Sequence, residues 1–368
     1  MRIGIDAREL QGRPTGTGRY LRNLLREWAR EAGDTLIAYF NGPAPDDPVT
    51  RGFGLHIRPL GPGGVRGTYW QERVLPTAAE ADRLDVLFSP AYTCPIRLRV
   101  PRVTTVHDLS FFSLPQDFTL VDGFRRRYLV SRSVAVSAAI VAVSDFTRRE
   151  ICRRFPEAAE RVFAVLSGRD DDLAAAPERS VARQQLDLTG PYLLTVGTLL
   201  NRRCLPDLLQ AVALVARRHP DLTLEVVGEN RTHPRLDLPA LVRDAGLERR
   251  VLLPGFVSEA ALALRYGAAD VAIFLSEYEG FGLPALEAMA RGVPVVASRP
   301  PALGEIFRDA ALLVEPRDPP GIAAAIGRIL DSAALATDLR ARGRVLAARH
   351  SWVDAARATR DILERAAR

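Results

Sequence analysis

The chain has 368 residues, 47% of them hydrophobic, and a formal net charge of +6. This length predicts two domains of ordinary size, each with enough apolar residues for its own core. No run of about 18 apolar residues occurs, which excludes a membrane-spanning helix, and the first residues have the pattern of a strand rather than of a signal peptide.

The positive charge comes from arginine, since all 50 residues of the Lys-plus-Arg class are arginine. A basic chain favours an anionic partner such as a nucleotide, a phospholipid surface or a nucleic acid. Zinc-finger spacings and the aromatic motif of RNA-recognition domains are both missing from the sequence, so we expect no nucleic-acid partner. Cys94, Cys152 and Cys204 have neither disulfide nor metal spacing, which fits the reducing cytoplasm where we expect this protein.

Strand-like and helix-like segments alternate along the first half of the chain. A helix is predicted over 19–32, with three leucines and Trp28 on one face. A polar segment over 167–190 precedes a fresh strand and predicts the connection between two domains. The expected strands of the first half are 2–7, 35–40, 85–89, 102–108 and 140–144.

The second half repeats this alternation. Its expected strands are 192–197, 222–228, 251–256, 271–276 and 293–298, with helices over 206–218 and 284–291. A last helix over 353–366 has apolar residues that need a partner surface, namely Val353, Ala356, Ile362 and Leu363. Strands that alternate with helices form parallel sheets covered by helices on both faces, so the fold class is α/β.

Polar residues and glycines lie at or just beyond the ends of several predicted strands. Asp6, His107 and Ser144 do so in the first half, and Gly197 and Glu279 do so in the second. Ligands bind beyond the carboxyl ends of the strands in open parallel sheets, so we expect the site there. Ser144 is also a natural N-cap for the helix that follows it, and this structural role explains it fully.

The segment SEYEGFGLPALEAMARGVPVVAS is the most informative in the chain. Gly280 and Gly282 permit positive φ and a close approach of a ligand to the backbone. Pro284 suits the first turn of a helix, whose unpaired N–H groups favour a phosphate. Glu279 and Glu287 beside such a turn predict a ligand with both phosphate and hydroxyl groups, as in a sugar nucleotide.

This segment resembles the Glu-x7-Glu region of the retaining glycosyltransferases of family 4, which have the GT-B fold. The resemblance rests on Glu279, Gly280, Phe281, Gly282, Pro284, Glu287 and the PVVAS strand. It implies two Rossmann-like domains with parallel sheets facing across a cleft, and a C-terminal helix that crosses back to the first domain. The corresponding boundaries are 1–172 for the acceptor-binding domain, 173–350 for the donor-binding domain and 351–368 for the last helix.

A second segment, VGTLLNRRCLPDLLQA, resembles the family's strand, short loop, Arg-Lys-Asn triplet and helix, here with Arg202, Arg203 and Cys204. Two arginines at a helix start can neutralise a diphosphate and stabilise a departing nucleotide. Arginine for lysine keeps the charge but replaces a compact ammonium with a planar fork, and Cys204 lacks the side-chain amide of asparagine. The alternative is a solvated basic helix start.

The resemblance also assigns residues from two segments of the first half to the site. Gly16 and Gly18 in the loop PTGTGR would approach the diphosphate or the acceptor. A dinucleotide site is not expected there, because Leu21 and Asn41 replace the glycine and the acidic residue that it needs. His107 in VHDLSFF matches a histidine that reaches the transferred sugar, and the alternative is a hydrogen-bonded structural histidine.

By resemblance, the chain is a metal-independent retaining hexosyltransferase that uses a GDP- or UDP-linked sugar and a carbohydrate or lipid-linked hydroxyl acceptor in cell-surface glycan or glycolipid assembly. No cofactor or metal is expected. The catalytic residues would be Glu279, His107, Arg202 and Arg203. The donor would contact Gly16, Gly18, Gly197, Arg202, Arg203, Glu279, Gly280, Phe281, Gly282, Leu283 and Glu287.

Two other functions stay open, a non-hydrolysing sugar-nucleotide epimerase and a non-catalytic sugar-nucleotide-binding subunit. The epimerase would share the nucleotide site, and the departures at Arg203 and Cys204 favour the subunit. No Asp-x-Asp motif stands at a predicted strand end, and the acidic run 170–172 falls in the expected linker.

The segment GFRRRYLVSRS combines arginines with aromatic and apolar residues. It fits either a peripheral contact with an anionic membrane, at its inner face, or a solvated helix face.

Overall fold

The structure of the chain is a computed structural model. It describes residues 1–12, 15–31, 33–46, 49–50, 55–61, 63, 67–169, 177–299 and 302–368. The chain forms two compact units. Unit 1 comprises Met1–Ser113, Leu120–Gly168 and Ser351–Arg368, and unit 2 comprises Leu114–Thr119 and Arg169–His350.

Unit 1 is built on a seven-stranded sheet in the order β3-β2-β1-β4-β5-β6-β7, in which all neighbouring strands pair in parallel. Its strands are β1 (Arg2–Asp6), β2 (Thr35–Phe40), β3 (His56–Pro59), β4 (Val86–Ser89), β5 (Arg102–Val106), β6 (Ala139–Ala142) and β7 (Val162–Ala164). The central strand β1 is buried from Ile3 onward, so the core of the unit lies on both faces of this strand.

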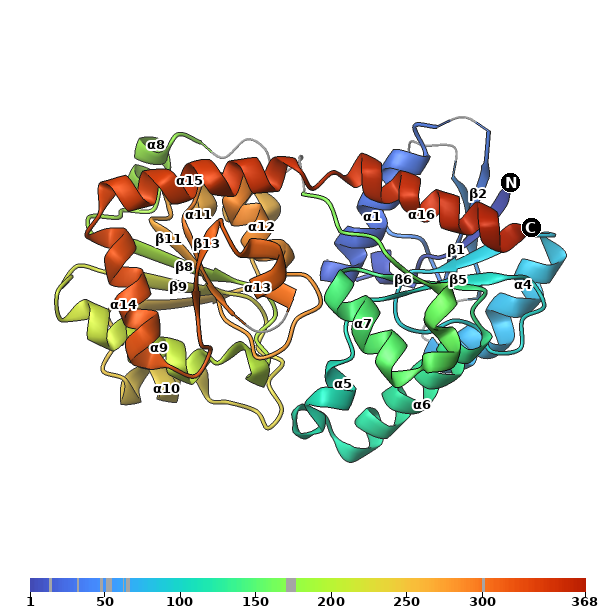
Figure 1. Cartoon of the computed structure of the whole chain (residues 1–368), viewed down its shortest axis with the longest axis horizontal. Helices are drawn as coiled ribbons and strands as arrows, with labels where there is room; N and C mark the ends of the chain where they lie inside the picture. Colours follow the sequence, from blue (N-terminus) through green and yellow to red (C-terminus); the bar gives the residue numbers. More distant parts are fainter. Residues whose placement is uncertain are drawn as a thin grey trace. The chain divides into compact units, whose positions relative to one another are not determined.

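Helices cover the sheet of unit 1 (Figure 1). They are α1 (Gly16–Trp28), α3 (Gly67–Tyr69), α4 (Leu75–Ala81), α5 (Ser110–Ser113), α6 (Leu120–Val136), α7 (Asp145–Arg154) and α16 (Trp352–Ala367), with 3₁₀-helices over Arg8–Leu10 and Pro156–Arg161 and a π-helix over Trp70–Val74. The face predicted for α1 is buried, namely Leu21, Leu24, Leu25 and Trp28. The N-cap role predicted for Ser144 is confirmed, because its side chain accepts the N–H of Thr147.

The last helix, α16, belongs to unit 1, as predicted. It packs against α1 and against β4, β5 and β6 (Figure 1). The indole Nε1 of Trp28 donates to the carbonyl oxygen of Ala356 at 2.9 Å, which fixes the two helices to each other. Of the apolar residues expected to need a partner, Ile362 and Leu363 are buried, but Val353 is 43% exposed. Trp352, one residue earlier, lies in the core in its place.

Unit 2 is built on a six-stranded parallel sheet in the order β10-β9-β8-β11-β12-β13. Its strands are β8 (Tyr192–Val196), β9 (Thr223–Val227), β10 (Val251–Gly255), β11 (Val271–Phe274), β12 (Val295–Ser298) and β13 (Ala311–Val314). Its helices are α8 (Arg179–Gln185), α9 (Leu205–Ala216), α10 (Leu238–Asp244), α11 (Glu259–Ala268), α12 (Leu283–Ala290), α13 (Ala302–Phe307), α14 (Pro319–Leu330) and α15 (Ala333–Ala348), with turns over Pro115–Asp117 and Asn201–Arg203. The α/β class with two parallel sheets is therefore confirmed.

Several details differ from the sequence-based expectation. The strands β3, β7 and β13 were not predicted, and each lies at an edge of its sheet. Part of the expected linker is the helix α8, which packs against α11. The predicted helix over 19–32 starts earlier, at Gly16. Its predicted last residue, Ala32, and the acidic run 170–172 lie outside the described residues.

No described helix combines the length and the apolar character that crossing a bilayer requires.

Replacing Leu363 with alanine should destabilise unit 1, because its side chain is 0% exposed between α16 and the sheet. We expect Leu363→Ala to lower the free energy of unfolding by about 2–5 kcal/mol. The matched control is Val353→Ala in the same helix, which we expect to change it by less than about 0.5 kcal/mol. Urea unfolding followed by circular dichroism measures both, and equal losses would contradict the placement of α16.

Candidate active site

The strand order of unit 2 creates a switch point between β8 and β11. The chain runs from β8 outward to β9 and β10 and then returns to place β11 on the other side of β8. Open α/β sheets bind ligands where the connections from two such strands diverge. The connections that leave β8 and β11 contain 197–204 and 275–282. They include the predicted donor residues of this domain except Leu283 and Glu287, which follow at once in α12.

The connection after β8 is a tight turn that presents two arginines. Gly197 leaves the strand with φ of 132°, a conformation that favours glycine. A turn over Asn201–Arg203 follows, closed by Cys204 with φ of 51°. This left-handed conformation suits asparagine or glycine better than cysteine. Cys204 thus adopts a conformation that the family's asparagine would tolerate better, and burial raises the pKa of its thiol to about 12.

The carboxylate of Glu279 lies between these arginines. Its Oε1 is 3.2 Å from Nη2 of Arg203 and 3.6 Å from Nε of Arg202, and it accepts the hydroxyl of Ser276 at 3.1 Å. Glu279 is only 8% exposed and Arg202 only 9%, so each would be costly to leave without an opposite charge. The guanidinium of Arg203 also stacks 4.2 Å from the centroid of the Phe274 ring. Three of the four predicted catalytic residues thus form one cluster.

The connection after β11 ends at the start of α12. Gly282 is the N-cap with φ of 101°, and a Cβ there would lie 2.6 Å from Cδ2 of Leu303. Of the two glycines expected to permit positive φ, Gly282 adopts it and Gly280 does not. Phe281 is 5% exposed, and its ring meets that of His350 edge to face at 5.5 Å. Phe281 therefore anchors this connection in the core of unit 2.

Glu287 lies within α12 and is 3% exposed. Its Oε2 accepts the hydroxyl of Tyr266 at 3.0 Å, and the same hydroxyl contacts the carbonyl oxygen of Pro284 at 3.2 Å. Its own carbonyl oxygen accepts from Nη1 of Arg291 at 3.2 Å. The second predicted carboxylate is therefore positioned by α11, separately from the arginine cluster.

In unit 1, His107 directly follows β5, and its ring forms a hydrogen bond with the backbone. Its Nε2 lies 2.8 Å from the carbonyl oxygen of Pro90, which only accepts, so Nε2 has the proton. Burial lowers the pKa of His107, which keeps the ring neutral at neutral pH with Nδ1 as an acceptor. Asp108 accepts the N–H of Ser110 at 2.8 Å and the hydroxyl of Tyr92 at 3.1 Å. Asp108 thus caps the next turn.

Gly16 and Gly18 lie in the first turn of α1 and not in a loop before it. Thr15 is the N-cap, and its Oγ1 accepts the N–H of Gly18 at 3.0 Å. A Cβ on Gly18 would lie 2.5 Å from the carbonyl oxygen of Glu9, whereas a Cβ on Gly16 would meet nothing within 4 Å. Gly18 therefore permits the close packing of α1 against the turn Arg8–Leu10, while Gly16 has open space beside it.

Two site residues were not predicted from the sequence. Ser276 stands three residues before Glu279, at the end of a predicted strand in the same segment, but no local motif indicates that their side chains bond. Tyr266 lies 21 residues before Glu287 on another helix, and no local pattern links the two. Within the described ranges, no group of three or more His, Cys, Asp or Glu side chains is arranged to hold a metal ion.

Comparison with known proteins covers both halves of the chain. Residues 178–346 match the glycosyl transferases group 1, and residues 14–173 match glycosyltransferase family 4. The chain is 33% identical over 274 residues to O-antigen chain mannosyltransferase B of Escherichia coli, an alignment of 73% of this chain and 71% of that protein. It is 32% identical over 231 residues to the MMP alpha-(1->4)-mannosyltransferase of Mycolicibacterium hassiacum, across 62% of this chain and 54% of that relative.

Solved structures share the fold along the whole chain. Sucrose-phosphate synthase from Thermosynechococcus elongatus matches with a TM-score of 0.81 and 23% identity, over 99% of this chain and 98% of that one. Anabaena HepE, solved with UDP and glucose, matches with a TM-score of 0.76 and 18% identity, over 99% of each chain. These likenesses confirm the predicted GT-B fold.

The two glycines of α1 should respond differently to alanine. We expect Gly18→Ala to lower the free energy of unfolding by about 1–3 kcal/mol, because the added Cβ overlaps backbone and not a flexible side chain. Gly16→Ala should be neutral or stabilising by up to about 1 kcal/mol, since alanine is the better helix residue. Thermal and urea unfolding measure both variants, and a larger loss in Gly16→Ala would refute this assignment.

Proposed function

This chain belongs to the glycosyltransferases of family 4, and we propose that it transfers a hexosyl residue, with retention of configuration, from a nucleoside diphosphate sugar to a hydroxyl acceptor. The observation that carries the proposal is the cluster of Arg202, Arg203 and Glu279 at the switch point of unit 2. A cationic pair beside a helix start suits a diphosphate, and a buried carboxylate suits sugar hydroxyls.

The arginines would receive the negative charge that builds on the β-phosphate as the sugar–phosphate bond breaks. Donors lower a barrier most when they already point at the position where charge develops. Glu279 and the ring of Phe274 hold Arg203 in one position, so little reorganisation is needed. The first turn of α12, after Gly282, would add backbone N–H groups and the positive end of the helix dipole.

The two glutamates would bind different parts of the donor. Glu279, at the arginine cluster, would accept hydroxyl groups of the transferred sugar. Glu287, which Tyr266 positions, would accept the ribose hydroxyls of the nucleotide. Neither role requires the glutamate to exchange a proton with the substrate, unlike the carboxylate pair of a glycosidase.

His107 of unit 1 would contact the transferred sugar. Its lowered pKa supports this role, because a neutral ring with the Nε2 proton on Pro90 presents Nδ1 as an acceptor for a hydroxyl. Gly16 and Gly18 would approach the diphosphate or the acceptor, and Gly16 has the space for a close approach.

The relatives point to the sugar and to the acceptor class. Two are named mannosyltransferases, one of them for an O-antigen chain. One structural neighbour was solved with UDP and glucose. We propose a mannosyl residue, linked to GDP or UDP, as the transferred group, and a growing cell-surface glycan or glycolipid as the acceptor.

The start of α6 supports a peripheral contact with an anionic membrane on its cytoplasmic side, where a lipid-linked acceptor would be reached. Its exposed apolar side chains are Leu120, Val121, Phe124 and Tyr128. The rings of the last two stack at 6.5 Å, and Arg125 and Arg126 stand beside them. Apolar side chains flanked by arginines suit the headgroup region of a bilayer.

The epimerase and the binding subunit differ from a transferase in what they consume. An epimerase converts the sugar nucleotide without an acceptor, and a subunit turns nothing over. Incubation with GDP-mannose or UDP-hexoses, with and without a saccharide acceptor, separates all three outcomes by the products formed.

Replacing Glu279 with glutamine should abolish most of the turnover. The variant keeps the shape but removes the charge that positions Arg202 and Arg203, so we expect kcat to fall roughly 100–1000-fold, as on loss of a transition-state donor. Release of the nucleoside diphosphate in the presence of acceptor measures the rate, and the unfolding midpoint checks that the fold is retained.

The matched control is Glu277→Gln in the same connection. The side chain of Glu277 pairs with Arg317, and only its backbone N–H contacts Arg202, at 2.8 Å. Turnover of this variant should stay within about twofold of the parent, because exposed ion pairs contribute little. Equal losses in the two variants would remove the special role assigned to Glu279.

Added EDTA should leave turnover intact. The guanidinium groups of Arg202 and Arg203 provide the positive charge that a metal ion supplies to the leaving diphosphate in other transferases. Initial rates measured in buffer stripped of metal, before and after addition of Mg²⁺ or Mn²⁺, test this. A collapse of activity that the metal restores would show that the arginines are insufficient.

A further inference from the structure

A cavity lies in unit 2 at the ends of the strands opposite to the candidate active site. It has a volume of 1090 Å³. Its lining includes Pro191 and Asp270, which directly precede β8 and β11, and Val293, two residues before β12. Since the strands are parallel, the cavity lies at their amino ends, whereas the arginine cluster lies at their carboxyl ends.

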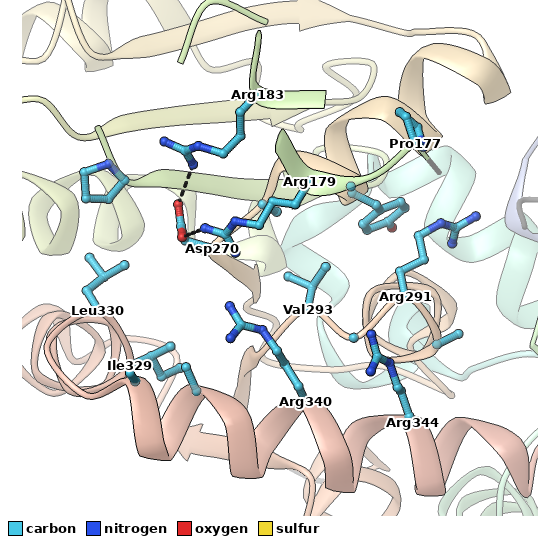
Figure 2. Close-up of a pocket in the computed structure, with 18 of the residues that line it drawn as sticks. Pro177, Arg179, Arg183, Asp270, Arg291, Val293, Ile329, Leu330, Arg340 and Arg344 are labelled. Carbon is cyan, nitrogen blue, oxygen red and sulfur yellow. Dashed lines mark hydrogen bonds and ion pairs between the residues drawn. The ribbon is translucent and has the colours of Figure 1, made fainter. Parts of the chain in front are cut away.

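The lining of this cavity is strongly basic. Its described residues include one acidic residue, Asp270, and the six arginines Arg169, Arg179, Arg183, Arg291, Arg340 and Arg344. Asp270 is bound by Arg179 and by Arg183, the latter at 2.9 Å (Figure 2). Its charge is therefore shared by two arginines, and the described lining retains a surplus of positive charge.

The helix α15 adds two more arginines to the cavity. Arg340 and Arg344 are four residues apart, so they project from one face of the helix, and Figure 2 shows both pointing into the cavity. Neither makes a hydrogen bond or an ion pair within the described ranges. Burial, together with the like charges of Arg179 and Arg344, lowers the pKa of Arg340. Like charges near one another raise the free energy of this arrangement of side chains.

Arg291 has a separate structural role. Its guanidinium lies 4.9 Å from the ring centroid of Tyr266, and its Nη1 donates to the carbonyl oxygen of Glu287. It thus compensates the negative end of α12, as basic residues at helix C-termini do. The arginines available to a ligand without loss of such a contact are Arg340 and Arg344.

We propose that this cavity is a binding site for a compact polyanion that has two or more phosphate groups. Guanidinium groups bind phosphate oxygens in pairs, through strong charge-assisted hydrogen bonds. The volume is that of a small-molecule site and far exceeds the space of a single phosphate. A polyanion would neutralise Arg340 and Arg344 together and would end their mutual repulsion.

The test uses the full chain and inorganic tripolyphosphate as the probe, measured by isothermal titration calorimetry. We expect Arg340→Gln with Arg344→Gln to weaken binding at least roughly tenfold, since two charge-assisted contacts are lost. The matched control is Arg342→Gln on the same helix, which pairs with Asp338 and does not line the cavity. It should change the affinity less than about twofold. Similar losses in both would overturn the site.

A second experiment tests whether tripolyphosphate binds at the candidate active site instead. The double variant Arg202→Gln with Arg203→Gln should still bind tripolyphosphate with parental affinity. If this variant loses binding while the Arg340 and Arg344 variant keeps it, the probe occupies the donor site and the proposal fails. If the double variant does not fold, the single variants Arg340→Gln and Arg344→Gln take its place. Each should bind tripolyphosphate more weakly than the parent.

The chain's own acidic run is the rival occupant, because the sequence has three aspartates directly after Arg169. Replacement of all three, Asp170→Asn, Asp171→Asn and Asp172→Asn, tests it. An affinity for tripolyphosphate that stays within about twofold supports a site for an external polyanion. Binding that is seen only in this variant would show that the arginines serve the acidic run instead.

Discussion

The carboxylate of Glu279 is bound by two guanidinium groups that come from a different strand–helix connection. The backbone repeats this link, because the N–H of Glu277 donates to the carbonyl oxygen of Arg202. Together these contacts join the connections after β8 and β11 where the strand order diverges. Because Glu279 and Arg202 are nearly removed from water, neither charge is tolerable without the other. The same requirement that stabilises unit 2 therefore orients the residues assigned to the donor.

The helix α12 lies between this cluster, at the carboxyl ends of the strands, and the basic cavity at their amino ends. It begins at the left-handed Gly282, contains Glu287 and ends one residue before Arg291. Tyr266 contacts both regions, since its hydroxyl binds Glu287 and its ring lies under Arg291 in the basic cavity. With eight residues, α12 is about 12 Å long. Glu287 and the basic cavity therefore share one short helix and one packing partner, Tyr266.

The sequence predicted where several candidate residues lie better than it predicted the edges of the fold. Glu279 and the two arginines come soon after the buried strands β11 and β8 in recognisable local patterns, so their place at the switch point was predictable. The strands β3, β7 and β13 lie at sheet edges and are only partly buried, whereas the predicted four-residue strands β4, β6, β11 and β12 are buried throughout and give a clearer apolar signal. Gly18 was predicted from its likeness to a ligand-binding loop, and nothing in the sequence indicated that the carbonyl of Glu9 beside it also requires a glycine. Such contacts depend on tertiary packing that no local pattern encodes.

The absence of lysine has a physical consequence at Arg203. A guanidinium is planar, so Arg203 can stack on Phe274 and pair with Glu279 at the same time. A lysine ammonium, compact and strongly hydrated, could form the ion pair but could not present a flat face to the ring. Arginine in place of lysine therefore restrains the cationic group at position 203 more strongly, where we expect the charge of the leaving group to develop. The αL conformation of Cys204 lies directly after this restrained arginine, so the altered triplet keeps the turn and its charge while its side chains change.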